Sequence, residues 1–510
     1  MDESAISKDL ASVFRIIEED KDVMLSWLKE LVAIPTVSAE LSHRQDIMRL
    51  IEQTQEKLKK HGVHVTLEPL GDQRLSDGSK VPYPPLLLAS TTHDAKRKTL
   101  CVYGHLDVQP ARKDDGWDTE PFQPVEKDGR LYGRGTGPQQ GSADRLHLGS
   151  VRLPADGGKA ASQCQGKPRQ FCCKKYIESG PRATQPAYVC RHYNAEGERA
   201  VEDAEQMMID SMQEVDSEGI AAYLKSSKKS DLLGGIDYVC IADGVWLRPK
   251  SPCLTYALSV VCLSNRISSS GSIEAMPDLM YLLNSLTDAE GRIKVPGIYD
   301  EVLPLTHEER KVYEGVEFNV EEYRKELGIA RLATTDKVEL LMRRWRYPTL
   351  SIHGVEGAHW SAGDKAVIPG RVVGKFSIRT VPNQKVQKVR ECVEKHLQEQ
   401  FRKRGSPNQV KVITSHCVDP WFTDPSGPNF QAAEAAVKDA YGLVPDKTRG
   451  GFTVGPAKLI QEHVCRDVLV MPINPPGCGF HSQNEHISVT DLVAGAKLFA
   501  AYMYELSKLK

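Results

Sequence analysis

A histidine and an aspartate stand two residues apart in the segment YGHLDVQP (103–110). Side chains at positions i and i+2 of an extended chain point the same way, so His105 and Asp107 can contact each other. A neighbouring carboxylate that fixes the tautomer of an imidazole is the usual support of a metal-bound histidine. The same pair also suits a histidine at a strand end that an aspartate caps for structural reasons alone. The spacing by itself fits both interpretations.

Two more polar groups follow apolar segments. His481 lies in GFHSQNE (479–485), and Asp243 lies in IADGVW (241–246) directly after the apolar run YVCIA. A single histidine in a loop is more often solvated than metal-bound, and a strand-end aspartate is commonly a turn former. If these residues and His105 end or follow strands of one sheet, their side chains should meet within a few ångströms of a shared centre.

The surrounding segments predict the elements that would position these residues. Apolar residues at helical spacing favour helices over 9–34, 44–63 and 489–509, and short apolar runs favour strands over 99–104 and 467–473. Helices that alternate with apolar strands are typical of an α/β fold with a mostly parallel sheet. In such sheets ligands bind beyond the carboxyl ends of the strands.

The middle of the chain has a different pattern. Residues 372–381 alternate as a strand does, and residues 385–404 have the spacing of a helix. At 510 residues the chain is too long for one hydrophobic core. We therefore expect a catalytic domain made of 1–250 and 418–510, with a smaller α+β lid or dimerisation domain, 251–417, inserted into it.

One stretch predicts no element at all. Residues 137–199 lack a helical or strand period and are rich in Gly, Ser, Gln, Arg and Pro. Such a composition buries too little apolar surface to offset the entropy of ordering, so we expect this stretch to be disordered or extruded. Its cysteines and His192 lack the paired spacing of a zinc site.

The overall composition narrows the classes of function. The formal charge is −2 and 26% of the residues are charged, which argues against a nucleic-acid or membrane partner. The acidic N-terminus does not resemble a secretory signal. The 12 cysteines are scattered and several lie in apolar runs, which indicates buried thiols rather than a disulfide framework. We therefore expect a cytoplasmic protein.

Several motifs together carry a resemblance to a known family. They are LCVYGHLDVQP, DGWDTEPFQPVEKDGRLYGRG, DYVCIADGVWL, RRWRYPTLSIHGVEGA, VIPGRVVGKFSIRTVPN and FHSQNE, in this order. The chain resembles the cytosolic non-specific dipeptidase and carnosine dipeptidase branch of the two-metal aminoacylase-like metallopeptidases, over about 1–135 and 214–510. The resemblance implies a homodimeric metallodipeptidase with two divalent ions, zinc or manganese, that cleaves a carnosine-like or Cys-Gly-like dipeptide.

The resemblance also implies roles for single residues. It implies four metal ligands, namely His105, Glu214, Asp243 and His481. It further implies that Asp107 orients His105 for catalysis. Arg379 and His416 match residues on the substrate side, where the forked guanidinium of Arg379 suits the C-terminal carboxylate of a dipeptide.

Two departures from the family pattern touch the site itself. The aspartate that bridges the two ions in the family is missing after YGRG (132–135), and Gln213 occupies the position of the general base. An amide cannot accept a proton at neutral pH. These departures leave open a catalytically impaired homologue that keeps one ion through His105 and Asp243, or a defective gene model in which 137–199 replaces the true segment.

Overall fold

The computed structural model describes residues 7–75, 77–91, 98–137, 192–193, 199–201, 204–215, 217, 219–226, 233–258, 260–262, 274–357, 368–414, 419–450 and 455–509. Most of the stretch 137–199 lies outside these residues, so its expected disorder stays a prediction. At its end, β8 (His192–Tyr193) and β9 (Arg199–Val201) pair as antiparallel strands, which the sequence did not predict. None of the described helices is long and apolar enough to cross a membrane.

The chain divides into two compact units. Unit 1 comprises Met1–Leu254, Ser426–Pro445 and Leu459–Lys510, and unit 2 comprises Thr255–Pro425 and Asp446–Lys458. An inserted second domain was expected from the sequence, with bounds of 251–417. Unit 2 begins at 255 and its first segment ends at 425, and the unit also includes 446–458, which the expected bounds left in the catalytic domain.

Unit 1 is built around a sheet with a parallel centre. Its strands that lie wholly within unit 1 follow the order β1, β4, β10, β5, β11, β18. The strands β10, β5, β11 and β18 run parallel, whereas β4 is antiparallel to β10 and β1 is antiparallel to β4. Their bounds are β1 (His64–Glu68), β4 (Leu86–Ser90), β5 (Thr99–His105), β10 (Ala204–Asp210), β11 (Tyr238–Ile241) and β18 (Val468–Val470). The predicted α/β fold with a mostly parallel sheet is confirmed.

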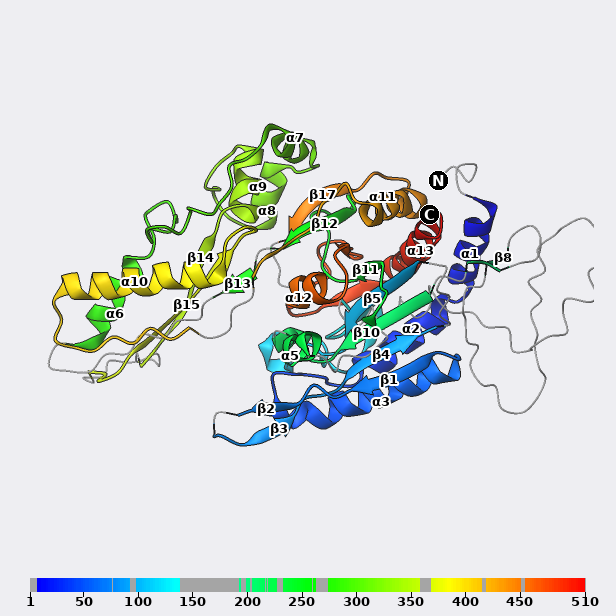
Figure 1. The fold of residues 1–510 in the computed structure, drawn as a ribbon, viewed down its shortest axis with the longest axis horizontal. Helices are drawn as coiled ribbons and strands as arrows, with labels where there is room; N and C mark the ends of the chain where they lie inside the picture. The colour runs from blue at the N-terminus through cyan, green and yellow to red at the C-terminus, as the bar shows by residue number, and fades with distance from the viewer. Residues whose placement is uncertain are drawn as a thin grey trace, which may run out of the picture. The chain divides into compact units, whose positions relative to one another are not determined.

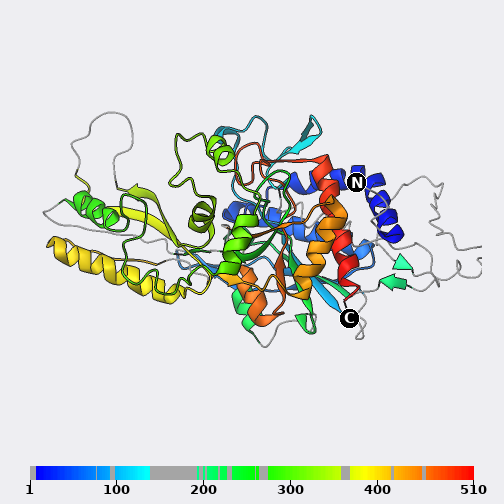
Figure 2. The same ribbon diagram turned by 90° about the horizontal axis from the view of Figure 1, so that it is seen from above.

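Helices cover this sheet, as Figures 1 and 2 show. The apolar residues of α3 pack with Val65 of β1, with Leu87 of β4 and with Ile209 of β10 in one core. The helices α11 and α13 lie side by side, and the Tyr502 hydroxyl of α13 donates to the Asn429 side chain of α11. Among the described residues, the helices that lie wholly within unit 1 are α1 (Lys8–Glu19), α2 (Lys21–Val32), α3 (Arg44–Lys60), α5 (Ile220–Lys225), α11 (Pro428–Tyr441) and α13 (Val489–Leu506).

The segment 9–34 folds differently from its prediction as one helix. It forms α1 and α2, which are separated at Asp20. Asp20 has φ −94° and ψ 7°, outside the helical region, and it serves as the C-cap of α1 and the N-cap of α2. The apolar spacing continues through the break because both helices contribute to one core with α13, so the pattern alone could not reveal it.

Unit 2 contains a three-stranded antiparallel sheet in the order β13, β15, β14. Helices α6 and α10 pack on it around a core that includes Leu279, Phe376 and Val393. The helices of unit 2 are α6 (Ala275–Asn284), α7 (His307–Gly315), α8 (Val320–Glu326), α9 (Lys337–Trp345) and α10 (Val386–Arg404). Its strands are β13 (Val260–Cys262), β14 (Thr349–Glu356), β15 (Val373–Thr380), β16 (Trp421–Phe422) and β17 (Asp446–Gly450).

Two elements cross from one unit to the other along the chain, namely β12 (Cys253–Leu258) and α12 (Pro456–His463). Short elements complete unit 1. They are β2 (Asp72–Arg74), β3 (Lys80–Pro82), β6 (Val125–Lys127), β7 (Arg130–Tyr132), β19 (His486–Ser488), η1 (Leu41–His43), η2 (Lys113–Asp115) and η3 (Gln213–Val215). The strand β19 pairs with β7, which places the loop before β19 beside the turn after β7.

Candidate active site

Three neighbouring parallel strands end at the same edge of the unit 1 sheet. His105 is the last residue of β5 and pairs in register with Asp210, the last residue of β10. Asp243 follows two residues after the end of β11, which pairs with β5 on its other side. Carboxyl ends of parallel strands are the common place for ligands in α/β proteins. The edge therefore collects an imidazole and two carboxylates on adjacent strands.

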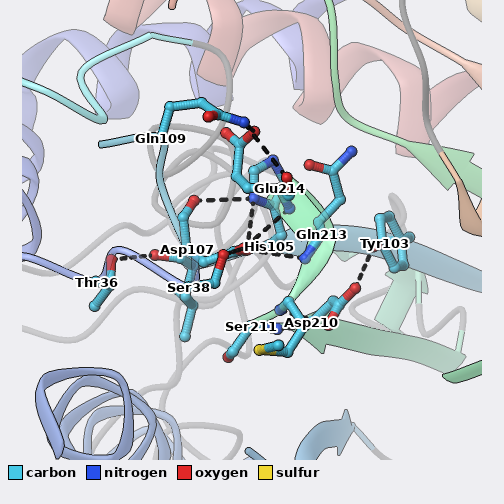
Figure 3. Close-up of polar contacts among 12 residues, drawn as sticks. Thr36, Ser38, Tyr103, His105, Asp107, Gln109, Asp210, Ser211, Gln213 and Glu214 are labelled. Carbon is cyan, nitrogen blue, oxygen red and sulfur yellow. Dashed lines mark hydrogen bonds and ion pairs between the residues drawn. The ribbon is translucent and has the colours of Figure 1, made fainter. Parts of the chain in front are cut away.

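Asp107 is the organising residue of this edge, and its side chain is fully buried. One carboxylate oxygen, Oδ2, accepts hydrogen bonds from the Ser38 hydroxyl at 2.6 Å and from the Glu214 backbone N–H at 2.9 Å. The other, Oδ1, accepts from the Gln213 N–H at 3.1 Å and lies 3.2 Å from His105 Nδ1. Figure 3 shows these contacts converging on one side chain. Asp107 thus ties the strand-end histidine to the turn at 213–214.

The two nitrogens of the His105 imidazole differ in their contacts. Nδ1 contacts the Asp107 carboxylate and also lies 3.1 Å from the Asp107 carbonyl oxygen. Nε2 is buried and has no hydrogen-bond partner among the described residues. Burial lowers the pKa of His105, but the hydrogen bond to Asp107 raises it. The net effect is a pKa raised to about 9. A buried imidazole nitrogen without a partner, opposite one held by a carboxylate, is the arrangement of a metal-ligating histidine.

Glu214 and His481 meet across the loops. Glu214 Oε1 lies 3.3 Å from His481 Nε2, although the two residues are 267 positions apart in the sequence. The Glu214 side chain is 4% exposed, whereas that of His481 is 41% exposed. His481 has a φ of 58°, a left-handed conformation that costs free energy in a residue with a side chain and is typical of functional loops.

The carboxylate of Asp243 is buried in the same neighbourhood. Burial raises the pKa of Asp243, and the charge of Glu214 also raises it. The charges of His105 and His481 lower it. The described residues nevertheless contain no group of three or more His, Cys, Asp or Glu side chains in the arrangement of a metal site. The imidazoles and carboxylates are the donor types that zinc and manganese accept, so the chemistry fits a divalent ion even though the ligand set stays a prediction.

Of the two residues expected on the substrate side, the structure describes Arg379 but not His416. Arg379 lies on β15 in unit 2, and its Nε is buried without a hydrogen-bond partner among the described residues. Burial lowers the pKa of Arg379, and so does the neighbouring charge of Arg344. His416 lies outside the described residues, so its role stays a prediction.

The sequence analysis did not identify several polar residues around the site. Asp210 accepts hydrogen bonds from the Tyr103 hydroxyl at 3.0 Å and from the Met212 N–H at 2.9 Å, and its pKa is raised by burial. Glu485 is fully buried and pairs with Arg134. Gln109 contacts Glu214. Only Gln109 had a usable signal, because it continues the i, i+2 spacing of His105 and Asp107.

Comparison with known families and proteins shows which family this chain belongs to. Residues 101–142 match the model of peptidase family M20/M25/M40, and residues 268–405 match a peptidase dimerisation domain. The Beta-Ala-His dipeptidase of Rattus norvegicus is 36% identical over 99% of this chain and 96% of its own length. The chain belongs to the M20 peptidase family. It is therefore an enzyme of the peptidase class.

Two further M20 proteins are similar to this chain over nearly its whole length. The Cys-Gly metallodipeptidase of Saccharomyces cerevisiae is 34% identical over 99% of both chains. The crystal structure of human carnosine dipeptidase 1 superposes with a TM-score of 0.81 and 34% identity, covering 99% of this chain and 100% of the human one. These comparisons give no support to the alternative of an impaired M20 homologue.

Proposed function

We propose that this protein hydrolyses dipeptides of the carnosine or Cys-Gly kind with the help of divalent metal ions. One observation carries the proposal, namely the buried Nε2 of His105, which has no hydrogen-bond partner among the described residues. Asp107 contacts the other ring nitrogen, and the charges of Asp243 and Glu214 raise the pKa of the imidazole. The M20 relatives that align over the full chain are named as Beta-Ala-His and Cys-Gly dipeptidases, which supports this substrate class.

The proposal assigns each residue a task. His105, Asp243, Glu214 and His481 would hold zinc or manganese, and Asp107 would fix the tautomer of His105. The bound metal would acidify a water molecule and polarise the peptide carbonyl. Arg379 would bind the substrate carboxylate through its guanidinium. Gln213 lacks a basic group, so the proposal does not assign it the proton transfer.

The test is a hydrolysis assay with Cys-Gly and β-Ala-His, with zinc or manganese added to the metal-free protein. We expect metal-dependent turnover that His105→Asn abolishes. The matched control is His43→Asn, because His43 is a partly exposed residue of η1 whose Nδ1 contacts Asp46 rather than a residue of the proposed site. Equal turnover in wild type and His105→Asn, or no turnover with either metal, would overturn the proposal.

We also propose that two copies of the chain associate. The match of residues 268–405 to a peptidase dimerisation domain supports a homodimer. Sedimentation of the purified protein should give about twice the chain mass of 56.6 kDa. A monomer at all micromolar concentrations would contradict this part of the proposal. The expected cytoplasmic location and the absence of a nucleic-acid partner stay predictions.

A further inference from the structure

The side chain of Gln109 contacts Glu214 at two points. Its amide nitrogen, Nε2, donates to Glu214 Oε2 at 2.6 Å and lies 3.4 Å from the Glu214 carbonyl oxygen. Figure 3 shows the amide pointing from the segment after β5 toward the Glu214 side chain. A primary amide carries two N–H groups, so one nitrogen can serve both acceptors. The shorter contact has the length of a hydrogen bond to a charged acceptor.

The two oxygens of Glu214 are thereby in different situations. Gln109 occupies Oε2, whereas Oε1 lies 3.3 Å from His481 Nε2. The carboxylate is 4% exposed, and a buried carboxylate requires hydrogen bonds to stay in place. Gln109 therefore restrains the carboxylate through Oε2, while Oε1 faces His481, the neighbouring residue of the proposed metal site.

Gln109 and Asp107 act on different parts of the same residue. Asp107 accepts from the backbone N–H groups of Gln213 and Glu214, so it holds the main chain of the turn. The shorter contact of Gln109, at 2.6 Å, is to the carboxylate, and its contact with the Glu214 carbonyl is longer at 3.4 Å, so Gln109 acts mainly on the side chain. Gln109 itself is only half-buried. Loss of its amide should therefore leave the fold and the turn intact while freeing the Glu214 carboxylate to rotate.

We propose that Gln109 is a positioning residue that orients the Glu214 carboxylate within the proposed metal site. The inference rests on the proposed function and adds to it a residue outside the ligand set. Hydrogen-bond partners of metal ligands typically contribute about 10–100-fold to metal affinity. Gln109 should contribute in this range without contacting the ion or the substrate.

The experiment measures the affinity of the metal-free protein for zinc by competition with a chromophoric chelator. We expect Gln109→Ala to weaken zinc binding by about 10–100-fold, with the thermal unfolding midpoint of the metal-free protein unchanged. Gln109→Glu has the same shape but no N–H donor, and it places a second carboxylate beside Glu214. It should therefore also weaken zinc binding in the same assay. The absorption spectrum of the cobalt-substituted protein should also differ between wild type and Gln109→Ala, because a freed carboxylate can change the coordination.

The matched control is Gln431→Ala. The Gln431 amide donates to the Ser426 carbonyl at 2.9 Å on the surface of the same unit, so its loss should leave zinc affinity unchanged. Gln109→Ala that binds zinc within about threefold of wild type would overturn this inference and leave the proposed function standing. Wild-type protein that binds neither zinc nor manganese would overturn the proposed function, and this inference with it.

Discussion

The carboxylate of Glu485 accepts a hydrogen bond from the guanidinium of Arg134 at 2.6 Å, and both side chains are buried. The two residues are 351 positions apart. Glu485 also accepts from the Gly137 N–H at 2.8 Å, and its own carbonyl accepts from the Gly133 N–H at 2.9 Å. This pair thus fastens the loop that carries His481 to the turn that follows β7.

Arg134→Ala should lower the free energy of unfolding strongly. The substitution leaves the Glu485 carboxylate buried without its cation, and breaking a buried ion pair on one side typically costs about 3–5 kcal/mol. The control is Lys29→Ala, which breaks an exposed pair with Glu126 in the same unit and should cost less than about 1 kcal/mol. Urea unfolding of both variants checks the prediction, and equal losses would contradict it.

Asp107→Asn should be as damaging as Asp107→Ala. Each carboxylate oxygen faces two hydrogen-bonding groups, so an amide in either orientation places its NH₂ against backbone N–H donors. We expect a loss of about 1–3 kcal/mol in unfolding free energy for both variants. Asp46→Asn, at a partly exposed helix position, serves as the control. A stable Asp107→Asn protein beside an unstable Asp107→Ala protein would show that the donors rearrange.

Divalent metal should stabilise the folded protein by mass action. A ligand at about 100 times its dissociation constant adds about 2.7 kcal/mol if it binds only the folded state. Zinc or manganese should therefore raise the thermal unfolding midpoint, and a chelator should reverse the shift. His105→Asn should remove most of the shift because it deletes the buried Nε2. A shift of full size in that variant would place the bound ion elsewhere.

Unit 2 should lose stability in mild acid through His396. Burial lowers the pKa of His396, whose Nε2 donates to the Ser285 carbonyl at 3.0 Å, although that hydrogen bond and Glu399 partly raise it. The unfolded chain therefore binds this proton more readily than the folded chain. Stability is present above the ordinary pKa of 6.5 and is lost as pH falls from there toward the lowered folded value.

The check on His396 is the unfolding free energy measured from pH 7.5 to 5, a range that brackets the ordinary pKa of about 6.5. One proton contributes at most about 1.4 kcal/mol per pH unit, so His396→Leu should flatten the curve by up to that slope. His307→Leu changes an exposed histidine of α7 and should keep the wild-type slope. An unchanged slope in His396→Leu would assign the acid sensitivity to other groups.

The sequence by itself determined what depends on local patterns. Apolar runs located β5, β11 and β18, and apolar spacing located α3, α10 and α13, because burial of one face imposes a period on the residues. The motif of His105 and Asp107 was readable because two side chains on one extended segment need no other element to meet. The family followed from several such motifs in a fixed order.

Only the tertiary structure decided the contacts between distant segments. The pairing of Glu214 with His481, of Gln109 with Glu214 and of Arg134 with Glu485 each requires loops from different parts of the chain. The break between helices at Asp20 and the inclusion of 446–458 in unit 2 were likewise decided only by the tertiary structure. A side chain that is buried or paired across the fold has the same local sequence as one in solvent, so its partner is set by the packing of the sheet and its loops.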